Sequence, residues 1–214
     1  MTGEPVPDAD AERLLRLADG LAEQLEARAR PVRFRAAIAP GEVEELFRLR
    51  YRTVVDQGWA RPEEFPDGLE RDAFDDRAVH LGGWAGGALA ACARLVFPEP
   101  GLGLPTEDAF GLAIPGGRAV DVGRGIVAPA WREGSHRVLT GLLARCWREL
   151  RSRGFSQMCG DAAPWLLTVY QGMGFEVEPL GPARRHWGED RVPIRIDGVA
   201  SMRRVLGRAG NRRG

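Results

Sequence analysis

The chain has 214 residues, 44% of them hydrophobic, which is enough to bury one full hydrophobic core. Its 30 Lys and Arg residues balance 30 Asp and Glu residues. This balance argues against a nucleic-acid binder, which must neutralise many phosphates, and against an acidic chain that stays solvated. We therefore expect one domain whose partner is small or only locally charged.

The spacing of cysteines and histidines argues against a disulfide framework and a metal site. The residues concerned are Cys92, Cys146, Cys159, His80, His136 and His186. No cysteines form a CxxC pair, and no histidines form an HxH or HExxH motif. We expect three buried thiols, no metal ion and no tightly bound cofactor.

The N-terminal segment MTGEPVPDADAER is acidic and has no apolar signal core. No stretch of the chain approaches the roughly 18 apolar residues that a membrane-spanning helix needs. These features predict a cytoplasmic protein without a membrane span.

The first third of the chain predicts a helix, a strand and a second helix. Residues 8–29 carry leucines at roughly helical spacing among charged residues, the pattern of an amphipathic helix. Residues 32–38 alternate apolar and basic residues, as a half-buried strand does, and Pro40 and Gly41 separate them from the second helix. Residues 57–78 have no period and are dense in Pro, Gly and carboxylates, so this loop is the first place to expect a site.

The middle of the chain predicts a hairpin, a strand and a long helix. Two apolar runs, residues 79–85 and 88–97, flank a Gly-Gly pair that readily supplies the positive φ angles of a tight turn. An irregular stretch with four prolines follows. Residues 118–128 then predict a strand, and residues 134–153 predict a helix with one apolar face.

The last quarter predicts strands at residues 155–159, 175–180 and 192–196, with a short helix between Pro164 and Met173. The order of elements indicates an α/β (α+β) fold, a single domain whose mixed central sheet has an antiparallel N-terminal part and flanking helices. We divide the chain into an N-terminal helical extension, the main domain and a basic tail expected to be disordered. These parts are residues 1–30, 31–202 and 203–214.

The segment after the 118–128 strand has the features of a phosphate-binding turn. A basic loop with Gly and Ser opens a long helix, whose N-terminus offers N–H groups to a phosphate. An ordinary strand-to-helix connection is the alternative. The sequence Val127-Ala-Pro129-Ala-Trp131-Arg132 resembles the entrance to the pyrophosphate loop of the GNAT acyltransferase superfamily. This resemblance implies an acyl-thioester site formed by Val127, Arg132, Gly134 and Ser135.

The loop after Arg132 departs from the superfamily pattern. It is one residue shorter, and His136 stands where the superfamily has a small residue. The co-substrate is therefore open between acyl-CoA and acyl-ACP, and the second choice makes an acyl carrier protein a partner.

The sequence Tyr170-Gln-Gly-Met-Gly174-Phe175 resembles the superfamily's Y-x-x-x-G-F motif. The resemblance implies that the Tyr170 phenol lies near the thioester sulfur and protonates the leaving thiolate. The alternative is a core aromatic in the last turn of a helix that Gly174 ends.

A further set of motifs covers the first two thirds of the chain. In order they are Leu49-Arg50-Tyr51, Gly58-Trp59, Glu70-x-Asp72-x-Phe74-Asp75, Arg94-Leu95 and Asp121-x-Gly123-Arg124. Their order and spacing resemble the acyl-homoserine-lactone synthases and the related N-acyl amino acid synthases. This resemblance implies a charged pocket for the amine substrate, formed by Arg50, Trp59, Asp72, Asp75, Arg94 and Arg124.

Without the family, the acidic run is also typical of a solvated surface loop. Arg94 and Arg124 nevertheless lie in apolar strand patterns, where an unpaired guanidinium costs several kcal/mol, so each needs a carboxylate partner. Such pairing can fix the long loop onto the sheet, contact the substrate, or do both.

Departures from the autoinducer synthases guide the choice of substrate. Val54 stands where those enzymes carry Phe, and Gly123 replaces their Ser. We therefore expect N-acylation of an amino acid or another small amine with a medium or long acyl chain. The alternatives are a lactone synthase that uses S-adenosylmethionine and a non-catalytic thioester-binding protein.

The expected mechanism is direct attack of the amine on the thioester, without a covalent enzyme intermediate. Asp121, or a water that it holds, takes the amine proton. The backbone N–H near Val127 meets the oxyanion, and Tyr170 assists departure of the thiolate.

Overall fold

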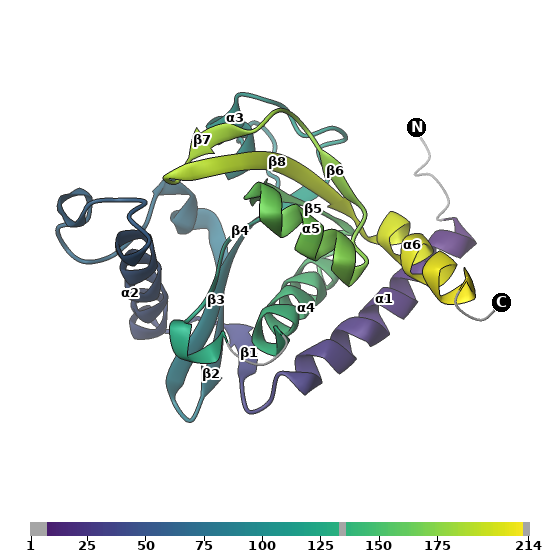
Figure 1. The fold of residues 1–214 in the computed structure, drawn as a ribbon, viewed down its shortest axis with the longest axis horizontal. Coiled ribbons are helices and arrows are strands. Elements are labelled where there is room, and N and C mark those ends of the chain that lie inside the picture. The colour runs from purple at the N-terminus through teal and green to yellow at the C-terminus, as the bar shows by residue number, and fades with distance from the viewer. Residues whose placement is uncertain (1–7, 133–135, 212–214) are drawn as a thin grey trace.

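A computed structural model describes residues 8–132 and 136–211 of the chain. A mixed eight-stranded sheet forms the centre, with helices on both faces (Figure 1). The strands are β1 Arg33–Ala36, β2 Ala78–Ala85, β3 Ala88–Val96, β4 Ala119–Val127, β5 Gln157–Ala162, β6 Val177–Pro179, β7 Arg184–His186 and β8 Glu189–Asp197. The helices are α1 Ala9–Arg28, α2 Pro40–Asp56, α3 Pro105–Phe110, α4 Arg137–Arg151, α5 Pro164–Met173 and α6 Gly198–Asn211. The mixed α/β architecture expected from the sequence is confirmed.

The sheet has the order β1-β2-β3-β4-β5-β8-β6, and β7 pairs with the free part of β8. Every neighbouring pair is antiparallel except β4 and β5. The parallel β4–β5 ladder is short, because it joins only Ala119–Asp121 to Gln157–Cys159. Both strands continue past this ladder, so β4 and β5 open a gap in the middle of the sheet.

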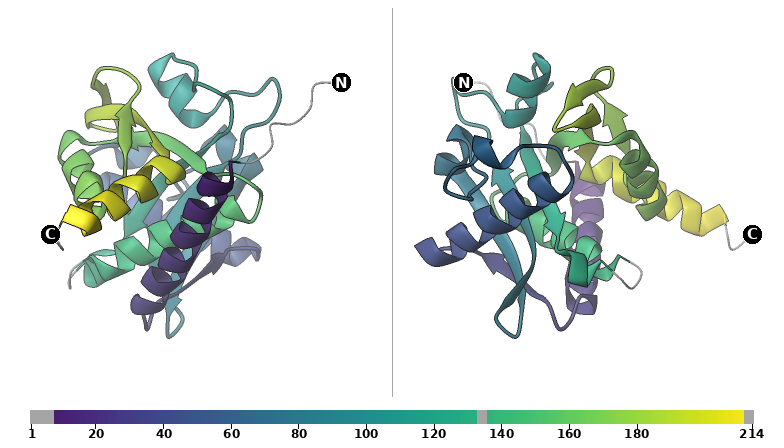
Figure 2. Two further views of the ribbon diagram at one scale, coloured as in Figure 1. Left: turned by 90° about the vertical axis from the view of Figure 1, so that its right-hand side faces the viewer. Right: turned by 60° about the vertical axis from the view of Figure 1, so that its left-hand side comes forward.

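The main core lies between the sheet and the pair of helices α1 and α4. Leu142 and Leu150 of α4 are almost fully buried there, together with Leu81 and Leu95 of the sheet. Figure 2 shows α1 lying alongside α4, and polar contacts join them at the rim, including the Trp147 Nε1–H bond to Asp19 at 2.8 Å. The α1 extension therefore packs as part of the core.

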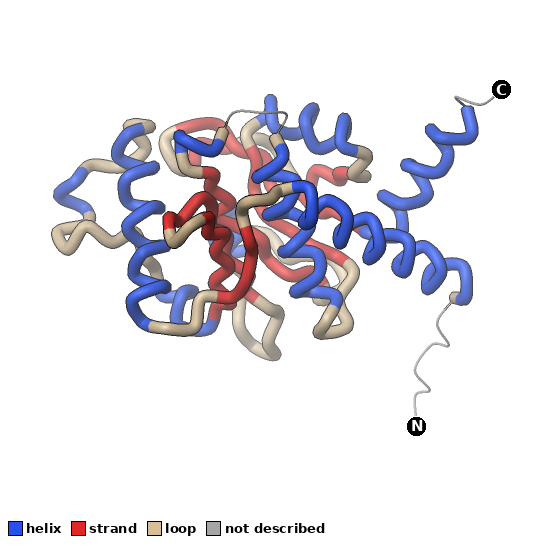
Figure 3. The backbone as a smooth tube through the Cα atoms, turned by 90° about the horizontal axis from the view of Figure 1, so that it is seen from below, coloured by secondary structure: helices blue, strands red, loops and turns tan. Residues whose placement is uncertain are grey.

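Helices α2 and α3 cover the opposite face of the sheet. In Figure 3 the strands lie between α2 and the α1–α4 layer. Buried residues Leu46 and Leu49 of α2 pack near Cys92 of β3. This face, between α2 and the gap, carries most of the charged residues discussed below.

The expectation of a loose tail after Met202 is wrong as far as Asn211. Residues 198–211 form α6, because apolar residues at helical spacing make one face that packs on α1. Met202 is buried there, and Arg203 reaches Asp10 of α1 at 3.3 Å. The density of arginines conceals this amphipathic pattern.

Two further elements are absent from the sequence-based prediction. Helix α3 lies in the stretch expected to be irregular, where Pro105 occupies its first turn and the Glu107 side chain accepts a hydrogen bond from the Leu104 N–H. Strand β7 pairs with β8 through a tight turn at Trp187 and Gly188. Both elements are too short to show a hydrophobic period.

None of the helices in residues 8–132 and 136–211 combines the length and apolar character needed to cross a membrane. Within the same residues, no three His, Cys, Asp or Glu side chains gather in a way that could hold a metal ion.

Candidate active site

Three arginines and three carboxylates form a buried ion cluster beside the gap. Its members are Arg50 of α2, Glu70, Asp72 and Asp75 of the loop before β2, Arg94 of β3 and Arg124 of β4. Arg50 binds Glu70 at 2.5 Å and both oxygens of Asp75 at 2.8 and 3.0 Å. Five of the six residues predicted to form the amine pocket therefore meet here, and Glu70 is the additional member.

The two remaining arginines tie the cluster to the sheet. Arg94 donates to Asp72 at 2.6 Å and to Asp75 at 3.3 Å. Arg124 donates to Asp72 at 2.9 Å and to Glu70 at 3.1 Å. The carboxylate partners that the apolar strand patterns demanded are thus present.

The loop geometry presents the carboxylates in one direction. Asp72 caps the 3₁₀ turn Ala73–Arg77 by accepting from the Phe74 N–H at 2.9 Å, and Asp75 accepts from the Asp72 N–H at 2.8 Å. The Glu70 N–H donates to the Phe47 carbonyl of α2 at 3.2 Å. Hydrogen bonds to both main chain and side chains therefore fix the aperiodic loop, as a preformed site requires.

Burial and charge act against each other in this cluster. Burial alone would raise the pKa of Glu70, but Arg124 and Arg50 outweigh it and lower that pKa. Burial likewise opposes ionisation of Asp75, yet hydrogen bonds and charge from Arg50 and then Arg94 lower the pKa of Asp75 to about 2. Glu70 and Asp75 are therefore held as anions facing cations, and the three arginines of the cluster equal its three carboxylates in number.

The cluster is open to solvent only at one end. Arg50 and Arg94 are 2% and 1% exposed, whereas the Asp72 side chain is 34% exposed. The Arg124 side chain is 15% exposed, and its guanidinium carbon is 4.4 Å from the centre of the Trp187 ring. Asp72, Arg124 and Trp187 are thus the partly exposed groups at this end of the cluster.

Asp121 lies beside the cluster on β4 but is nearly inaccessible. It is 3% exposed, and its carboxylate accepts from the Thr106 N–H of α3 at 2.8 Å. Burial raises the pKa of Asp121 to about 6, because no arginine pairs with it directly. The group is therefore mostly ionised at neutral pH but easily protonated below it.

The end of β4 leaves backbone groups facing the gap. The Ala128 N–H donates to the Ala90 carbonyl at 2.8 Å, and strand geometry then directs the Val127 N–H to the opposite side, toward the gap. The Val127 carbonyl accepts from Arg132 Nε at 2.9 Å. Gly134 and Ser135, the other predicted thioester ligands, lie outside the described residues.

Tyr170 of α5 packs against the main core, with its ring 6.0 Å from that of Phe175. Burial raises the pKa of Tyr170 to about 12, and Asp161 adds to the rise. The phenol therefore keeps its proton at neutral pH, which suits a proton donor and not a base.

Four residues around the gap were missed by the sequence analysis: Asp161, His186, Trp187 and Arg191. Arg191 of β8 pairs with Asp161 of β5 at 3.0 Å and lies 5.0 Å from the Trp59 ring. Burial lowers the pKa of His186, and Asp161 opposes that shift. Trp59 thus packs with the β7–β8 hairpin and not with the ion cluster. A Trp-Gly pair between two short polar runs is the one local signal for this hairpin.

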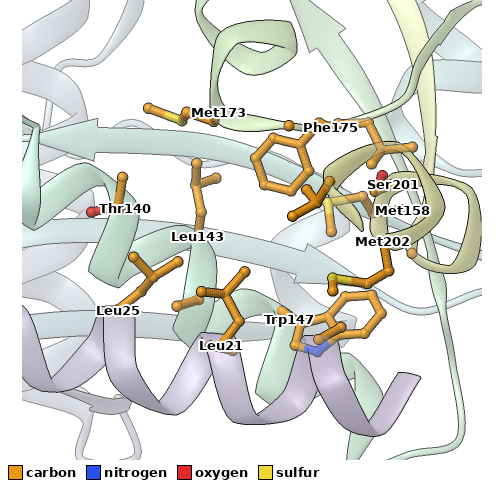
Figure 4. Close-up of a pocket in the computed structure, with 17 residues that line it drawn as sticks. Leu21, Leu25, Thr140, Leu143, Trp147, Met158, Met173, Phe175, Ser201 and Met202 are labelled. Atoms are coloured by element: carbon orange, nitrogen blue, oxygen red, sulfur yellow. The ribbon is translucent and has the colours of Figure 1, made fainter. Parts of the chain in front are cut away.

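An apolar pocket lies on the other side of β5, under the first and last helices (Figure 4). Its volume is about 110 Å³. Leu21 and Leu25 of α1 face Trp147, Phe175 and Met202 across it. Because Phe175 also contacts Tyr170, the pocket lies next to the residue predicted to serve the leaving thiolate.

The three cysteines are buried and unpaired with one another. Burial raises the pKa of Cys92 and of Cys146 to about 12, and also raises that of Cys159. We predict that iodoacetamide leaves the native protein unmodified at pH 7.5 and leaves thiol release unchanged, because reactive thiolates are absent at these positions. Intact-mass spectrometry before and after unfolding checks this, and modification of the native chain with loss of turnover would point to a cysteine nucleophile.

Residues 49–142 match the family model described as the acetyltransferase (GNAT) domain. This segment contains the whole ion cluster, β4 and the start of α4. No curated protein sequence matches the chain.

Solved structures extend the likeness to most of the fold. MesI, a CoA-dependent acyl-homoserine lactone synthase, is 27% identical, with 77% of this chain and 87% of that chain covered and a TM-score of 0.56. BjaI, a CoA-dependent acyl-homoserine lactone synthase solved with SAM and isopentyl-CoA, is 22% identical, with coverages of 77% and 82% and a TM-score of 0.59. FeeM, an N-acyl amino acid synthase from uncultured soil microbes, is 17% identical, with coverages of 81% and 94% and a TM-score of 0.64. Residues 49–142 therefore resemble a GNAT acetyltransferase domain, and the fold of the chain is similar to that of the autoinducer and N-acyl amino acid synthases.

Proposed function

We propose that this enzyme transfers a medium or long acyl chain from acyl-CoA or an acyl carrier protein to the amine of an amino acid or another small molecule. The observation that carries the proposal is the ion cluster, whose more exposed members are Asp72 and Arg124, the latter on β4, which borders the gap with β5. An ammonium group bound at the Asp72 carboxylate would lie beside the gap in which a thioester can be held.

The apolar pocket supports an acyl chain longer than acetyl. Its lining is almost entirely hydrocarbon and sulfur, and Phe175 connects it to Tyr170. Apolar cavities stay dry and bind apolar groups, so the pocket suits the far end of an acyl chain. The thioester carbonyl would then lie between Tyr170 and the end of β4.

The chain's own groups suffice for direct transfer. The amine gives a proton to Asp121 through a water and attacks the thioester carbonyl, whose oxyanion accepts from the Val127 N–H. Collapse of the tetrahedral intermediate breaks the C–S bond, and Tyr170 protonates the thiolate. The products are an N-acyl amine and a free thiol.

The test is thiol release by the purified protein. Decanoyl-CoA and decanoyl-loaded acyl carrier protein are each incubated with L-tyrosine, L-leucine or putrescine, and products are identified by mass spectrometry. The proposal expects an N-acyl amine from at least one pair and its loss in Arg124→Asn, a substitution that tolerates the positive φ of 53° at this position. Identical product profiles from wild type and this variant would contradict it.

Two alternatives give different results in the same assay. Release of methylthioadenosine when S-adenosylmethionine is added indicates a lactone synthase, for which the BjaI complex with SAM is the precedent. Tight binding of decanoyl-CoA without thiol release indicates a non-catalytic thioester-binding protein.

The pH profile should report Asp121. Since the ionised carboxylate accepts the proton, we predict that kcat/KM falls as the pH drops below about 6. The free energy of unfolding should change with pH in the opposite direction. The pKa of Asp121 in the folded state lies above the ordinary 3.8, so protonation of Asp121 stabilises the fold. This stabilisation is lost as the pH rises from 3.8 to about 6. In Asp121→Asn neither kcat/KM nor stability should depend on pH in this range, because an amide does not titrate. The amide oxygen can still accept from the Thr106 N–H, so the local structure should be kept. An unchanged acid limb in this variant would assign it to another group.

A further inference from the structure

Two strained residues touch each other above the ion cluster. Among the described residues, three that are not glycine have positive φ: Arg124 at 53°, Trp187 at 50° and His136 at 58°. The first two are in contact, with the Arg124 guanidinium carbon 4.4 Å from the indole centre. A bulky side chain with positive φ is a true outlier, and such strain gathers at functional sites.

The turn that carries Trp187 favours other residues. His186 pairs with Glu189, so Trp187 and Gly188 form a two-residue turn in which both φ angles are positive, at 50° and 68°. Asn-Gly and Asp-Gly are the pairs that such turns prefer. Local stability therefore disfavours tryptophan at this position, and the benefit must come from what the indole contacts.

The hairpin tip is held firmly over the gap. A Cβ on Gly188 would lie 2.8 Å from the Trp59 Cα, so only glycine fits against that residue. On the other side Arg184 donates to the Phe110 carbonyl at 2.8 Å, and the rings of Phe110 and His186 are 5.7 Å apart. The indole is thus fixed in position, while its own side chain remains only half-buried.

We infer that Trp187 is the specificity-determining wall of the acceptor site, where its indole holds the Arg124 guanidinium and bears against the ammonium-carrying part of the acceptor. The inference rests on the proposed function. Arg124 is already paired with Glu70 and Asp72, so the stack adds no charge partner that the guanidinium lacks. The indole stacks on the arginine that pairs with the exposed Asp72 carboxylate, and its other face is suited to an ammonium, since aromatic ring faces attract cations.

Trp187→Asn tests the role of the indole, because asparagine accepts the positive φ of the turn and removes the ring. We expect KM for the amine to rise about tenfold or more, KM for decanoyl-CoA to stay within twofold, and the melting temperature to stay equal or rise as strain is relieved. Trp187→Phe keeps a ring and should remain within threefold of wild type. Arg185→Ala, an exposed change in the same hairpin, should behave as wild type.

Unchanged amine KM in Trp187→Asn would overturn the inference. So would a lower melting temperature with both KM values raised equally, because that result describes a merely structural residue. If wild type releases no thiol with any donor and amine, the proposed function fails on its own. Calorimetric binding of L-tyrosine, L-leucine and putrescine to wild type and Trp187→Asn then decides the role of Trp187, and equal affinities would overturn it.

Discussion

Replacing Arg50 with methionine should lower the free energy of unfolding by about 3–5 kcal/mol, because it leaves Glu70 and Asp75 buried without their main cation. Methionine fills most of the space of the aliphatic stem, so the loss reports the charge and not a cavity. Against a typical total of about 5–15 kcal/mol, the variant would be marginal at 37 °C. Urea denaturation followed by circular dichroism measures the change.

The matched control is Arg48→Met, two residues away on the same helix. Arg48 pairs with Glu44, but the side chains are 59% and 44% exposed, so the change should cost less than about 1 kcal/mol. Equal losses in the two variants would mean that the buried cluster contributes no more than a surface pair. A loss confined to Arg50→Met also predicts that acid lowers the stability of this variant less than that of wild type, because Glu70 and Asp75 would then protonate at higher pH in the folded state and protonation removes their buried charge.

Replacing Tyr170 with phenylalanine should slow thiol release by about 10²-fold or more, because the leaving thiolate loses its proton donor. The ring and its contact with Phe175 remain, so stability should change little. The reaction of decanoyl-CoA with the best acceptor amine at saturation gives kcat. A donor with a more acidic thiol, such as the thiophenyl ester, should recover most of the rate because its thiolate leaves without help.

The chain contains only one other tyrosine, Tyr51, which provides the control. The centre of its ring is 6.2 Å from that of Phe65, a residue of the loop after α2. Tyr51→Phe should keep full activity. If Tyr170→Phe were equally active, the tyrosine would be a core residue and proton donation would fall to another group.

The regular elements of the fold were predictable where periodicity and turn residues agreed. The Gly86-Gly87 hairpin and the helix that begins at Pro164 are examples. The missed elements are short or compositionally disguised: α3 has six residues and β7 has three. In α6 three arginines and three glycines interrupt the apolar residues, and the helix is stabilised by packing on α1, which no local pattern reveals.

The site was predictable to the extent that burying an arginine demands a carboxylate. This argument anticipated pairing for Arg94 and Arg124, and the motif Glu70-x-Asp72-x-Phe74-Asp75 supplied the partners. The position of the residues around Trp187 could not be predicted from the sequence, because it results from pairing of β7 with β8 and not from a local residue spacing. For the same reason the sequence analysis grouped Trp59 with the charged pocket, whereas Trp59 packs with the β7–β8 hairpin.

The apolar pocket is lined by residues of both α1 and α6. Leu21 and Leu25 come from the first helix, Met202 and Val205 from the last, and Asp10 meets Arg203 between them. During synthesis the pocket therefore lacks a wall until α6 has emerged, however early the central sheet forms. A protein shortened before Gly198 should keep much of its sheet and lose the preference for long acyl chains that we propose.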